Sequence, residues 1–436
     1  MRFDLHMPSA ALALATALVA TPSFAEGDGV QLHTGVDVGF GWAGEDGFAL
    51  LLLEQGFSAS GFDLVLSGPL RFRIIDEAPE EGVIREQDWD EPSDFARIAP
   101  LIAFTKEWDD AEVDVRLGEL NGVVVGHGSL VDHYFNSVDM DHYQGGIRFD
   151  AGYAGNGIEF VIDDVVAPEI LAGRARIAPL AWFLDGDWPR RLEFGYTLGA
   201  DITAPRRVMG SSTVVIPVTG GDISLRVLDL DVASLTPYVD VMGMDGDVGV
   251  HAGLAASFTF SKKNEARLHA RGEYRRLGSD YHPALLNPFY DRSRRFYSRD
   301  PEGGGVNTLA DHLANPETED AASNGWMTDV VFSYGRALEI GARFDSEGRD
   351  RPHWLLVQLV ITPRGRFDLR ALYAGRDGNG AGELLSPDAL VSLGTRILLW
   401  GPFNVFAEYT RRFRRAGGEM PYANESGVGV GVYFSY

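Results

Sequence analysis

The last ten residues, Gly427 to Tyr436, read GVGVGVYFSY and constrain the fold more than any other stretch of the chain. One parity carries only apolar and aromatic residues, and the other carries three glycines, Tyr433 and Ser435. Successive side chains of a β-strand point to opposite faces. The segment therefore predicts a strand with one wholly apolar face. A strand of a soluble sandwich can alternate in this way, but it seldom ends the chain on an aromatic residue.

This ending resembles the closing strand of Gram-negative outer-membrane β-barrels, in which a terminal aromatic residue on the lipid-facing parity is the sorting signal. The resemblance is tight over these ten residues and assigns that role to Phe434 and Tyr436. It implies an all-β fold, a transmembrane antiparallel up-and-down barrel in the outer membrane. Long extracellular loops and short periplasmic turns are expected with it. A secreted all-β protein is the alternative.

The same period-two alternation recurs along the chain, as the wall of such a barrel requires. In residues 30–42, for example, Val36 and Val38 oppose Asp37 and Gly39. We expect external connections near residues 43–47, 76–93, 120–142, 165–170, 202–222, 243–247, 277–325, 346–352, 375–387 and 413–426. Ten such connections predict 20 strands, within a range of 16 to 20.

Composition agrees with this fold. A chain of 436 residues is too long for one globular core, whereas a barrel grows by adding strands. The formal charge of −25 argues against nucleic-acid binding. The absence of cysteine excludes disulfides and thiolate metal sites. We predict neither a cofactor nor a bound metal.

Residues 1–25 are expected to be a cleaved secretory signal peptide, with small residues at Ser23 and Ala25 before the cleavage site. Residues 26–436 are then the outer-membrane barrel. Because few residues precede Val30, we expect neither the plug of an energy-coupled receptor nor the passenger of an autotransporter. Aromatic residues near expected strand ends predict an interfacial girdle: Trp42, Phe48, Phe57, Trp108, Trp182, Phe183, Trp188, Trp326, Trp354, Trp400 and Phe403.

The lumen-facing parity carries a basic run on one strand, together with further arginines on other strands. These candidate selectivity residues are Arg71, Arg73, Arg267, His269, Arg271, Arg275, Arg370 and Arg396. Inward carboxylates are also expected. One interpretation is that these charges simply pair with one another along a wet wall. The other is a transverse field, positive on one wall and negative on another, that selects among charged solutes.

The loop from Asn121 to His142 is rich in side chains that can bind or react. In general porins a loop at this position folds into the barrel and narrows it, and we expect the same here for His127, Asp132, His133, Asp139, Asp141 and His142. A plain surface loop is the alternative. The histidine spacing fits no standard zinc pattern. A hydrolase centred on Ser129 is a further alternative, although no nucleophile-elbow motif surrounds it.

Two other external loops stand out. Residues 76–94 are acidic and predict either a solvated loop or a site for divalent cations that bridge to lipopolysaccharide. Residues 277–325 begin with aromatics and arginines, and we expect this half to pack over or into the barrel mouth.

The sequence thus predicts a porin-like channel, not an enzyme, for passive diffusion of small polar or charged solutes through a lumen lined by arginines and carboxylates. The expected partners are outer-membrane lipid and lipopolysaccharide, the outer-membrane assembly machinery and the solutes themselves. The alternative is a blocked barrel that serves as a structural or partner-binding surface. A barrel hydrolase is the third possibility.

Overall fold

A computed structural model describes residues 29–44, 46–76, 82–108, 110–184, 186–206, 212–299, 306–314, 322–348, 353–363, 367–377, 389–414 and 422–435. The expected signal peptide, residues 1–25, and the terminal Tyr436 lie outside these ranges.

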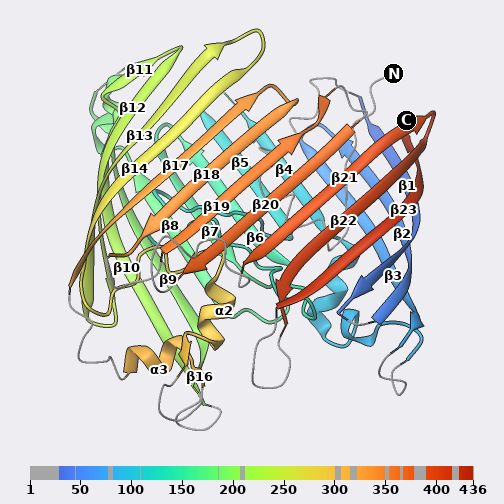
Figure 1. Ribbon diagram of the computed structural model, residues 1–436. Coiled ribbons are helices and arrows are strands. Elements are labelled where there is room, and N and C mark those ends of the chain that lie inside the picture. Colours follow the sequence, from blue (N-terminus) through green and yellow to red (C-terminus); the bar gives the residue numbers. More distant parts are fainter. Residues whose placement is uncertain are drawn as a thin grey trace.

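Within the described ranges, the main sheet has 21 strands, and all but the three-residue β11 (Leu228–Leu230) form the wall of a closed antiparallel barrel (Figure 1). The wall strands are β1 (Gln31–Ala43), β2 (Asp46–Ala59), β3 (Phe62–Ile75), β4 (Leu101–Glu107), β5 (Ala111–Gly118), β6 (Gly146–Tyr153), β7 (Asn156–Ile162), β8 (Ile170–Ile177), β9 (Leu192–Arg206), β10 (Ser212–Leu225), β12 (Ala233–Met244), β13 (Asp247–Ser261), β14 (Ala266–Leu277), β17 (Ser323–Tyr334), β18 (Leu338–Ser346), β19 (His353–Ile361), β20 (Phe367–Asp377), β21 (Leu390–Trp400), β22 (Phe403–Phe413) and β23 (Tyr422–Ser435).

The first and last strands close the barrel. β1 pairs with β23 from His33 opposite Ser435 to Ala43 opposite Glu425, so the sheet has no free edge there. The glycines of the final strand face the lumen, and Val428 and Val430 face outward with more than half of their surface exposed. The predicted barrel and the count of 20 wall strands are confirmed.

The bounds of one predicted connection are wrong. We expected an external loop over residues 202–222, but β9 continues to Arg206 and β10 begins at Ser212, with Arg206 paired to Ser212. The apolar run of residues 214–218 therefore belongs to a wall strand. The register shifts between Val214 and Ile216, where β9 has one more residue than β10 between Asp201 and Ala204, so the bulge lies on β9.

Connections differ between the two ends of the barrel. The long connection from β14 to β17, which contains α2 (Tyr290–Arg295) and α3 (Leu309–Ala314), lies at the end opposite to both termini (Figure 1). At the terminal end most turns are tight. Ser60 and Gly61 between β2 and β3 both have positive φ, as do Ala154 and Gly155 between β6 and β7, which suits the twist of a two-residue hairpin. A Cβ on Gly61 would lie 2.1 Å from the carbonyl oxygen of Thr105, so only glycine fits there.

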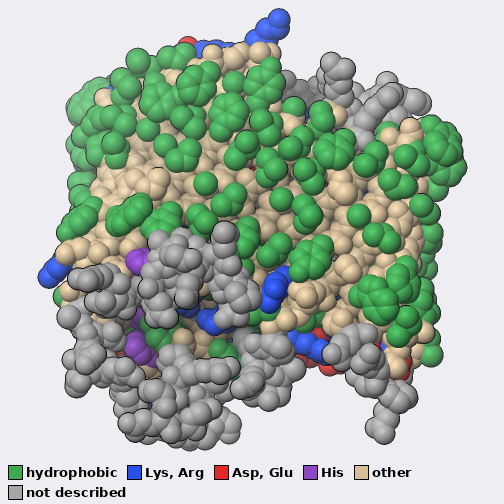
Figure 2. Space-filling model, in the orientation of Figure 1, with side chains coloured by type: hydrophobic (Ala, Val, Ile, Leu, Met, Phe, Trp, Pro, Cys, Tyr) green, Lys and Arg blue, Asp and Glu red, His purple; other side chains and the backbone are tan. Residues whose placement is uncertain are grey.

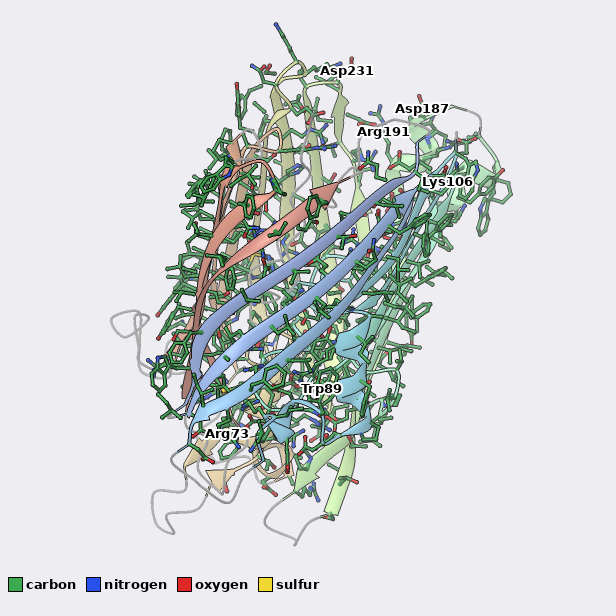
Figure 3. All side chains as sticks on the ribbon, turned by 90° about the vertical axis from the view of Figure 1, so that its right-hand side faces the viewer. Arg73, Trp89, Lys106, Asp187, Arg191 and Asp231 are labelled. Carbon is green, nitrogen blue, oxygen red and sulfur yellow. The ribbon has the colours of Figure 1, made fainter. Side chains whose placement is uncertain are left out.

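One connection at the terminal end is longer than predicted. Residues 178–191 link β8 to β9 and include the 3-10 helices η3 (Pro179–Trp182) and η4 (Trp188–Arg191). Trp182 and Trp188 are 59% and 57% exposed, and Phe183 is 80% exposed. Asp187 and Arg191 of this segment lie at the same end of the barrel as Lys106 and Asp231 (Figure 3).

The outer wall is apolar. Val38, Leu198, Leu254 and Leu393 are each between 44% and 53% exposed on the outward parity of their strands, and hydrophobic side chains cover the visible outer face (Figure 2). A closed sheet with this exterior satisfies its backbone hydrogen bonds internally and presents hydrocarbon to lipid. No helix in the described part of the chain is long and apolar enough to cross a membrane.

Two members of the expected aromatic girdle face inward instead. Phe48 and Trp354 are each only 1% exposed. The guanidinium of Arg73 lies 5.5 Å from the Phe48 ring, and that of Arg343 lies 4.7 Å from the Trp354 ring. These rings lie on the lumen parity near a strand end, where they pack against arginines. Trp42, Trp326 and Trp400 do face outward, at 40%, 50% and 69% exposure.

Candidate functional site

All eight basic residues predicted for the lumen lie on the inner parity of their strands. Arg71 and Arg73 are on β3, Arg267, His269, Arg271 and Arg275 are on β14, and Arg370 and Arg396 are on β20 and β21. The alternate residues of β14, such as Tyr274 at 57% exposure, face outward. The strand period alone accounts for this placement.

Six of these eight residues are paired with carboxylates. The pairs are Arg73 with Asp46, Arg71 with Asp88, Arg271 with Asp132, Arg275 with Asp345, Arg370 with Asp368, and Arg396 with Asp37, with nitrogen and oxygen 2.7 to 3.3 Å apart. Each pair lies on one wall or joins the wall to a loop. The two signs are therefore intermixed within these six pairs.

Arg267 and His269 differ from the other six. Both are exposed, and neither forms an ion pair with a described residue. They occupy the end of β14 nearer to the chain termini, where Arg267 pairs in register with Thr259 and Ser333. The Arg267 guanidinium and the His269 imidazole are therefore accessible to solutes in the lumen.

The loop between β5 and β6, residues 119–145, lies inside the barrel; we call it the inserted loop. Most of its side chains are buried, including Asp132, His133, Asp139 and His142. It contacts the other long loop through a bridge between Val131 and Leu286. The two flanking strands, β5 and β6, end at the barrel rim. The inserted loop is therefore buried by lumen-facing residues of the wall and by neighbouring loops.

Asp132 attaches the inserted loop to one wall. Its carboxylate lies 2.9 Å from Nη2 of Arg271 on β14 and also pairs with Arg343 on β18. Nδ1 of His133 lies 2.7 Å from the same carboxylate. Burial by itself would raise the pKa of Asp132, but the two guanidinium groups and His133 lower it below its usual range. Asp132 is thus a carboxylate at neutral pH.

His127 and Ser129 contact a second part of the wall. The His127 ring stacks on Tyr238 with 4.1 Å between centroids, and its Nε2 lies 3.4 Å from Asp222. The hydroxyl of Ser129 donates to Asp240 on β12. No hydrogen bond joins Ser129 to a histidine within the described ranges. The arrangement therefore lacks the nucleophile and base contact of a hydrolase.

The far end of the inserted loop reaches the opposite wall. The amide of Met140 donates to the carbonyl of Phe413 at the end of β22, 3.0 Å away. Asp141 pairs with Arg414 at 2.7 Å and with Arg85. His142 lies 2.8 Å from Glu91. In the described part of the chain, no three histidine, aspartate or glutamate side chains are placed to hold a metal ion.

Two apolar clusters hold the inserted loop from both sides. One joins its residues Val125 and Tyr134 to Met242 of β12 and to Tyr281 of the long loop that follows β14. The other joins Phe135 and Val138 to Trp354, Phe413 and Phe289. The aromatic half of the long loop therefore packs into the barrel mouth, as expected. The inserted loop thus crosses the lumen, from the wall formed by β9 to β12 to the wall formed by β19 to β22.

The acidic loop between β3 and β4 is less solvated than its composition indicates. Asp88, in the 3-10 helix η1 (Glu86–Asp88), lies within 3.0 Å of Arg71, 2.6 Å of Arg85 and 3.4 Å of Arg97. Burial raises the pKa of Asp88, but these three arginines lower it below its usual value overall. The Asp88 carboxylate is therefore neutralised by guanidinium groups. One of them, that of Arg97, comes from the adjacent 3-10 helix η2 (Pro92–Ile98).

Sequence reasoning overlooked how strongly the root of the inserted loop is buried. Glu119 directly follows β5, and burial raises its pKa to about 8, although Arg412 and Arg97 oppose that shift. One of its oxygens accepts no hydrogen bond among the described groups. The carboxyl group is therefore mostly protonated at neutral pH. A glutamate at a strand end gives no local signal of this burial, because the loops that cover it are distant in sequence.

The predicted sorting signal is described in part. Phe434 is 44% exposed on the outward parity of β23, while Tyr436 lies outside the described residues. An outward aromatic near the barrel rim can contact either lipid or another protein.

Comparison with known proteins shows structural likenesses only. No protein-family model matches the sequence, and no curated protein does so either. Among solved structures, the outer membrane protein OprD from Pseudomonas aeruginosa is 8% identical, with 93% of this chain and 94% of that chain covered and a TM-score of 0.33. OccK10 (OpdN) and OpdK from the same organism are each 8% identical, with 94% of this chain and 99% of those chains covered and TM-scores of 0.34 and 0.32.

Proposed function

We propose that the chain is a narrow outer-membrane channel through which small polar or charged solutes diffuse passively. The single observation that carries this proposal is the attachment of the inserted loop across the lumen by Asp132, which pairs with Arg271 and Arg343. A loop held in this way reduces the cross-section of a wide barrel to a path bordered by charged side chains. The closed wall, the apolar exterior and the loops at one end are those of an outer-membrane barrel.

Selectivity, in this proposal, comes from the charges that remain accessible. Each of the six paired arginines acts on a solute together with its carboxylate, so that the pair behaves as a dipole. Arg267 and His269, by contrast, present basic groups to the lumen. Arg148 and Arg116, at 32% and 26% side-chain exposure, face the same space from another wall, near Asp114. The planar guanidinium suits carboxylate and phosphate groups of passing solutes. Residues His127, Asp139, Asp141 and His142 act in this proposal as supports of the constriction.

A blocked barrel is the second candidate, because the two apolar clusters occupy the lumen at its loop end. A scaffold of this kind would use its long loops to bind a partner, and no solute would pass.

Recordings from planar lipid bilayers separate these two functions. The purified chain is expected to produce discrete ion steps smaller than those of an unobstructed barrel of this size. A variant with residues 124–133 replaced by glycine and serine is expected to give larger steps. If the unmodified protein gives no ion steps and this variant gives large ones, the barrel is a blocked scaffold instead. Silence from both, with folding verified by circular dichroism, would reject the channel.

A further inference from the structure

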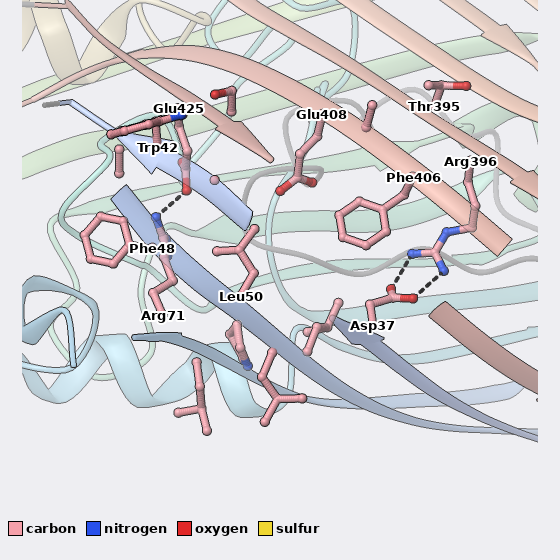
Figure 4. Close-up of a pocket in the computed structure, with 18 residues that line it drawn as sticks. Asp37, Trp42, Phe48, Leu50, Arg71, Thr395, Arg396, Phe406, Glu408 and Glu425 are labelled. Atoms are coloured by element: carbon pink, nitrogen blue, oxygen red, sulfur yellow. Dashed lines mark hydrogen bonds and ion pairs between the residues drawn. The ribbon is translucent and has the colours of Figure 1, made fainter. Parts of the chain in front are cut away.

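Two arginines on the outer wall lack the carboxylate partners that most lumen arginines have. Inside the barrel, for example, Arg396 lies 2.7 Å from Asp37, and both side chains are buried (Figure 4). Outside, Arg276 of β14 and Arg411 of β22 form no ion pair with a carboxylate in the described part of the chain. An arginine on the lipid-facing wall is costly at the middle of the bilayer and is tolerated near its surfaces. The depth of these two side chains therefore decides what they can bind.

Both arginines lie at the external rim of the lipid-facing wall. Arg276 is exposed and follows Arg275, which faces the lumen and has no exposed surface. Arg411 lies two residues after Tyr409, which pairs in register with the outward-facing Leu393. Both strands run towards the long loops and end within two residues of the arginine. In Figure 2, basic side chains border the apolar outer face on the side of these loops.

Arg276 belongs to a hydrogen-bonded cluster with Tyr274 and Asn324. Asn324 of β17 lies directly opposite Arg276 in the sheet. Its Oδ1 accepts from the hydroxyl of Tyr274 at 2.8 Å and from Nη1 of Arg276 at 3.0 Å. The acceptor of the amide is therefore already used. The amide nitrogen and the remaining guanidinium N–H groups, which are all donors, are left for a further partner.

The same arrangement recurs around Arg411. Asn424 of β23 lies directly opposite Arg411, and its Oδ1 accepts from the hydroxyl of Tyr409 at 2.9 Å. The guanidinium of Arg411 lies 5.7 Å from the Tyr422 ring, and its Nε donates to no described group. Each cluster thus combines a tyrosine, an arginine two positions later and an asparagine on the next strand. Both present N–H donors on the outside of the barrel.

The two clusters lie at the level expected for lipid headgroups. Tyr274 lies opposite Trp326, and the two side chains are 57% and 50% exposed. Tyrosine and tryptophan on the outer wall are typical of the boundary between hydrocarbon and headgroups. Arg276 is two residues nearer to the loops than Tyr274, about 7 Å along the strand, and the same step separates Arg411 from Tyr409. A guanidinium at this level meets phosphate oxygens, which it binds well.

We propose that the two clusters bind the phosphate groups of lipopolysaccharide in the external leaflet. In each cluster, one phosphate accepts from the guanidinium and from the asparagine amide, and the acyl chains of the same lipid lie on the apolar wall below. A dissolved anion gains nothing from that wall, so the site favours a lipid. The proposal goes beyond the channel function and is independent of it, because both clusters lie outside the lumen.

Lipid binding is measured on the full chain in detergent by native mass spectrometry, which counts bound lipids, and by titration calorimetry. The probes are lipopolysaccharide, the same lipid after chemical removal of its phosphates, and inorganic phosphate. Arg276→Gln and Arg411→Gln each remove one guanidinium, and the double variant removes both. Arg226→Gln is the matched control, because Arg226 is an exposed arginine beside Arg191 at the opposite end of the barrel. Circular dichroism verifies folding.

We expect the unmodified chain and Arg226→Gln to bind two lipids, each single variant one, and the double variant none. Removal of the phosphates should raise the Kd of the lipid about tenfold or more. Equal binding of the dephosphorylated lipid overturns the proposal, and this comparison needs no variant. Two lipids retained by a folded double variant overturn it as well. If inorganic phosphate binds as tightly as the lipid, the clusters are open anion sites and not lipid sites.

Discussion

The carboxylate of Asp132 and the guanidinium of Arg271 meet inside the barrel with Oδ2 2.9 Å from Nη2, although 139 positions separate the two residues in the sequence. Asp132 belongs to the inserted loop and Arg271 to the wall, so this pair fixes where the loop crosses the lumen. Because this ion pair is buried, loss of either residue would leave the charge of the other without a partner and without water.

Replacing Asp132 with asparagine should release the inserted loop. The substitution leaves Arg271 and Arg343 each short of one carboxylate, and breaking a buried pair costs about 3 kcal/mol. We expect larger and noisier single-channel currents in planar bilayers. Asp329→Asn is the matched control, because Asp329 lies 3.3 Å from Arg271 but belongs to the wall strand β17. If both variants conduct like the unmodified protein, Asp132 does not hold the constriction.

Arg267→Gln should shift ion preference toward cations. Arg267 is exposed in the lumen without an ion-pair partner among the described residues, so its loss removes an uncompensated positive charge. The ratio of cation to anion permeability, obtained from reversal potentials in a salt gradient, should rise by about a factor of two. Arg276→Gln, on the outward parity of the same strand, should leave this ratio unchanged. If the permeability ratio shifts equally in both variants, the effect comes from net charge at a distance and not from the exposure of Arg267 in the lumen.

Glu119 should make stability depend on pH in a defined direction. Burial raises the pKa of Glu119 to about 8 in the folded chain, above the usual value near 4.5, so the folded state holds a proton that the unfolded state releases. The free energy of unfolding should therefore fall as pH rises from about 4.5 to about 8 and then level off.

Glu119→Gln should remove this part of the pH dependence and leave the variant more stable than the unmodified protein at pH 9. Denaturant midpoints in detergent, measured from pH 5 to pH 9, provide the test. Parallel pH profiles for the two proteins would show that Glu119 titrates normally.

Leu254→Arg tests the lipid-facing wall. Leu254 is at the middle of β13, points outward and is 44% exposed. An arginine on the lipid face at the bilayer midplane costs about 2–4 kcal/mol. Folding titrations into lipid vesicles should show that loss. Ser257→Arg, on the inward parity of the same strand, should be much milder, and an equal loss at both positions would contradict the assignment of the two faces.

Much of the wall was predictable, because strand parity is a local property. Val36 against Asp37, and Val428 against Gly429, already separate the two faces, and external loops at regular intervals lead to 20 strands. Parity also placed Arg271 and Arg396 inward. It failed for Phe48 and Trp354, since a ring near a strand end is equally compatible with the interface and with an arginine inside the lumen.

The alternation of apolar and polar side chains by itself determined the barrel, its two faces and the inward position of the arginines, because each residue's face depends only on its neighbours in the strand. Only the tertiary structure decided that Asp132 pairs with Arg271 and Arg343, and that the carboxyl group of Glu119 is shielded from water. Those contacts depend on which strands become neighbours when the sheet closes, and on the path of loops across the lumen.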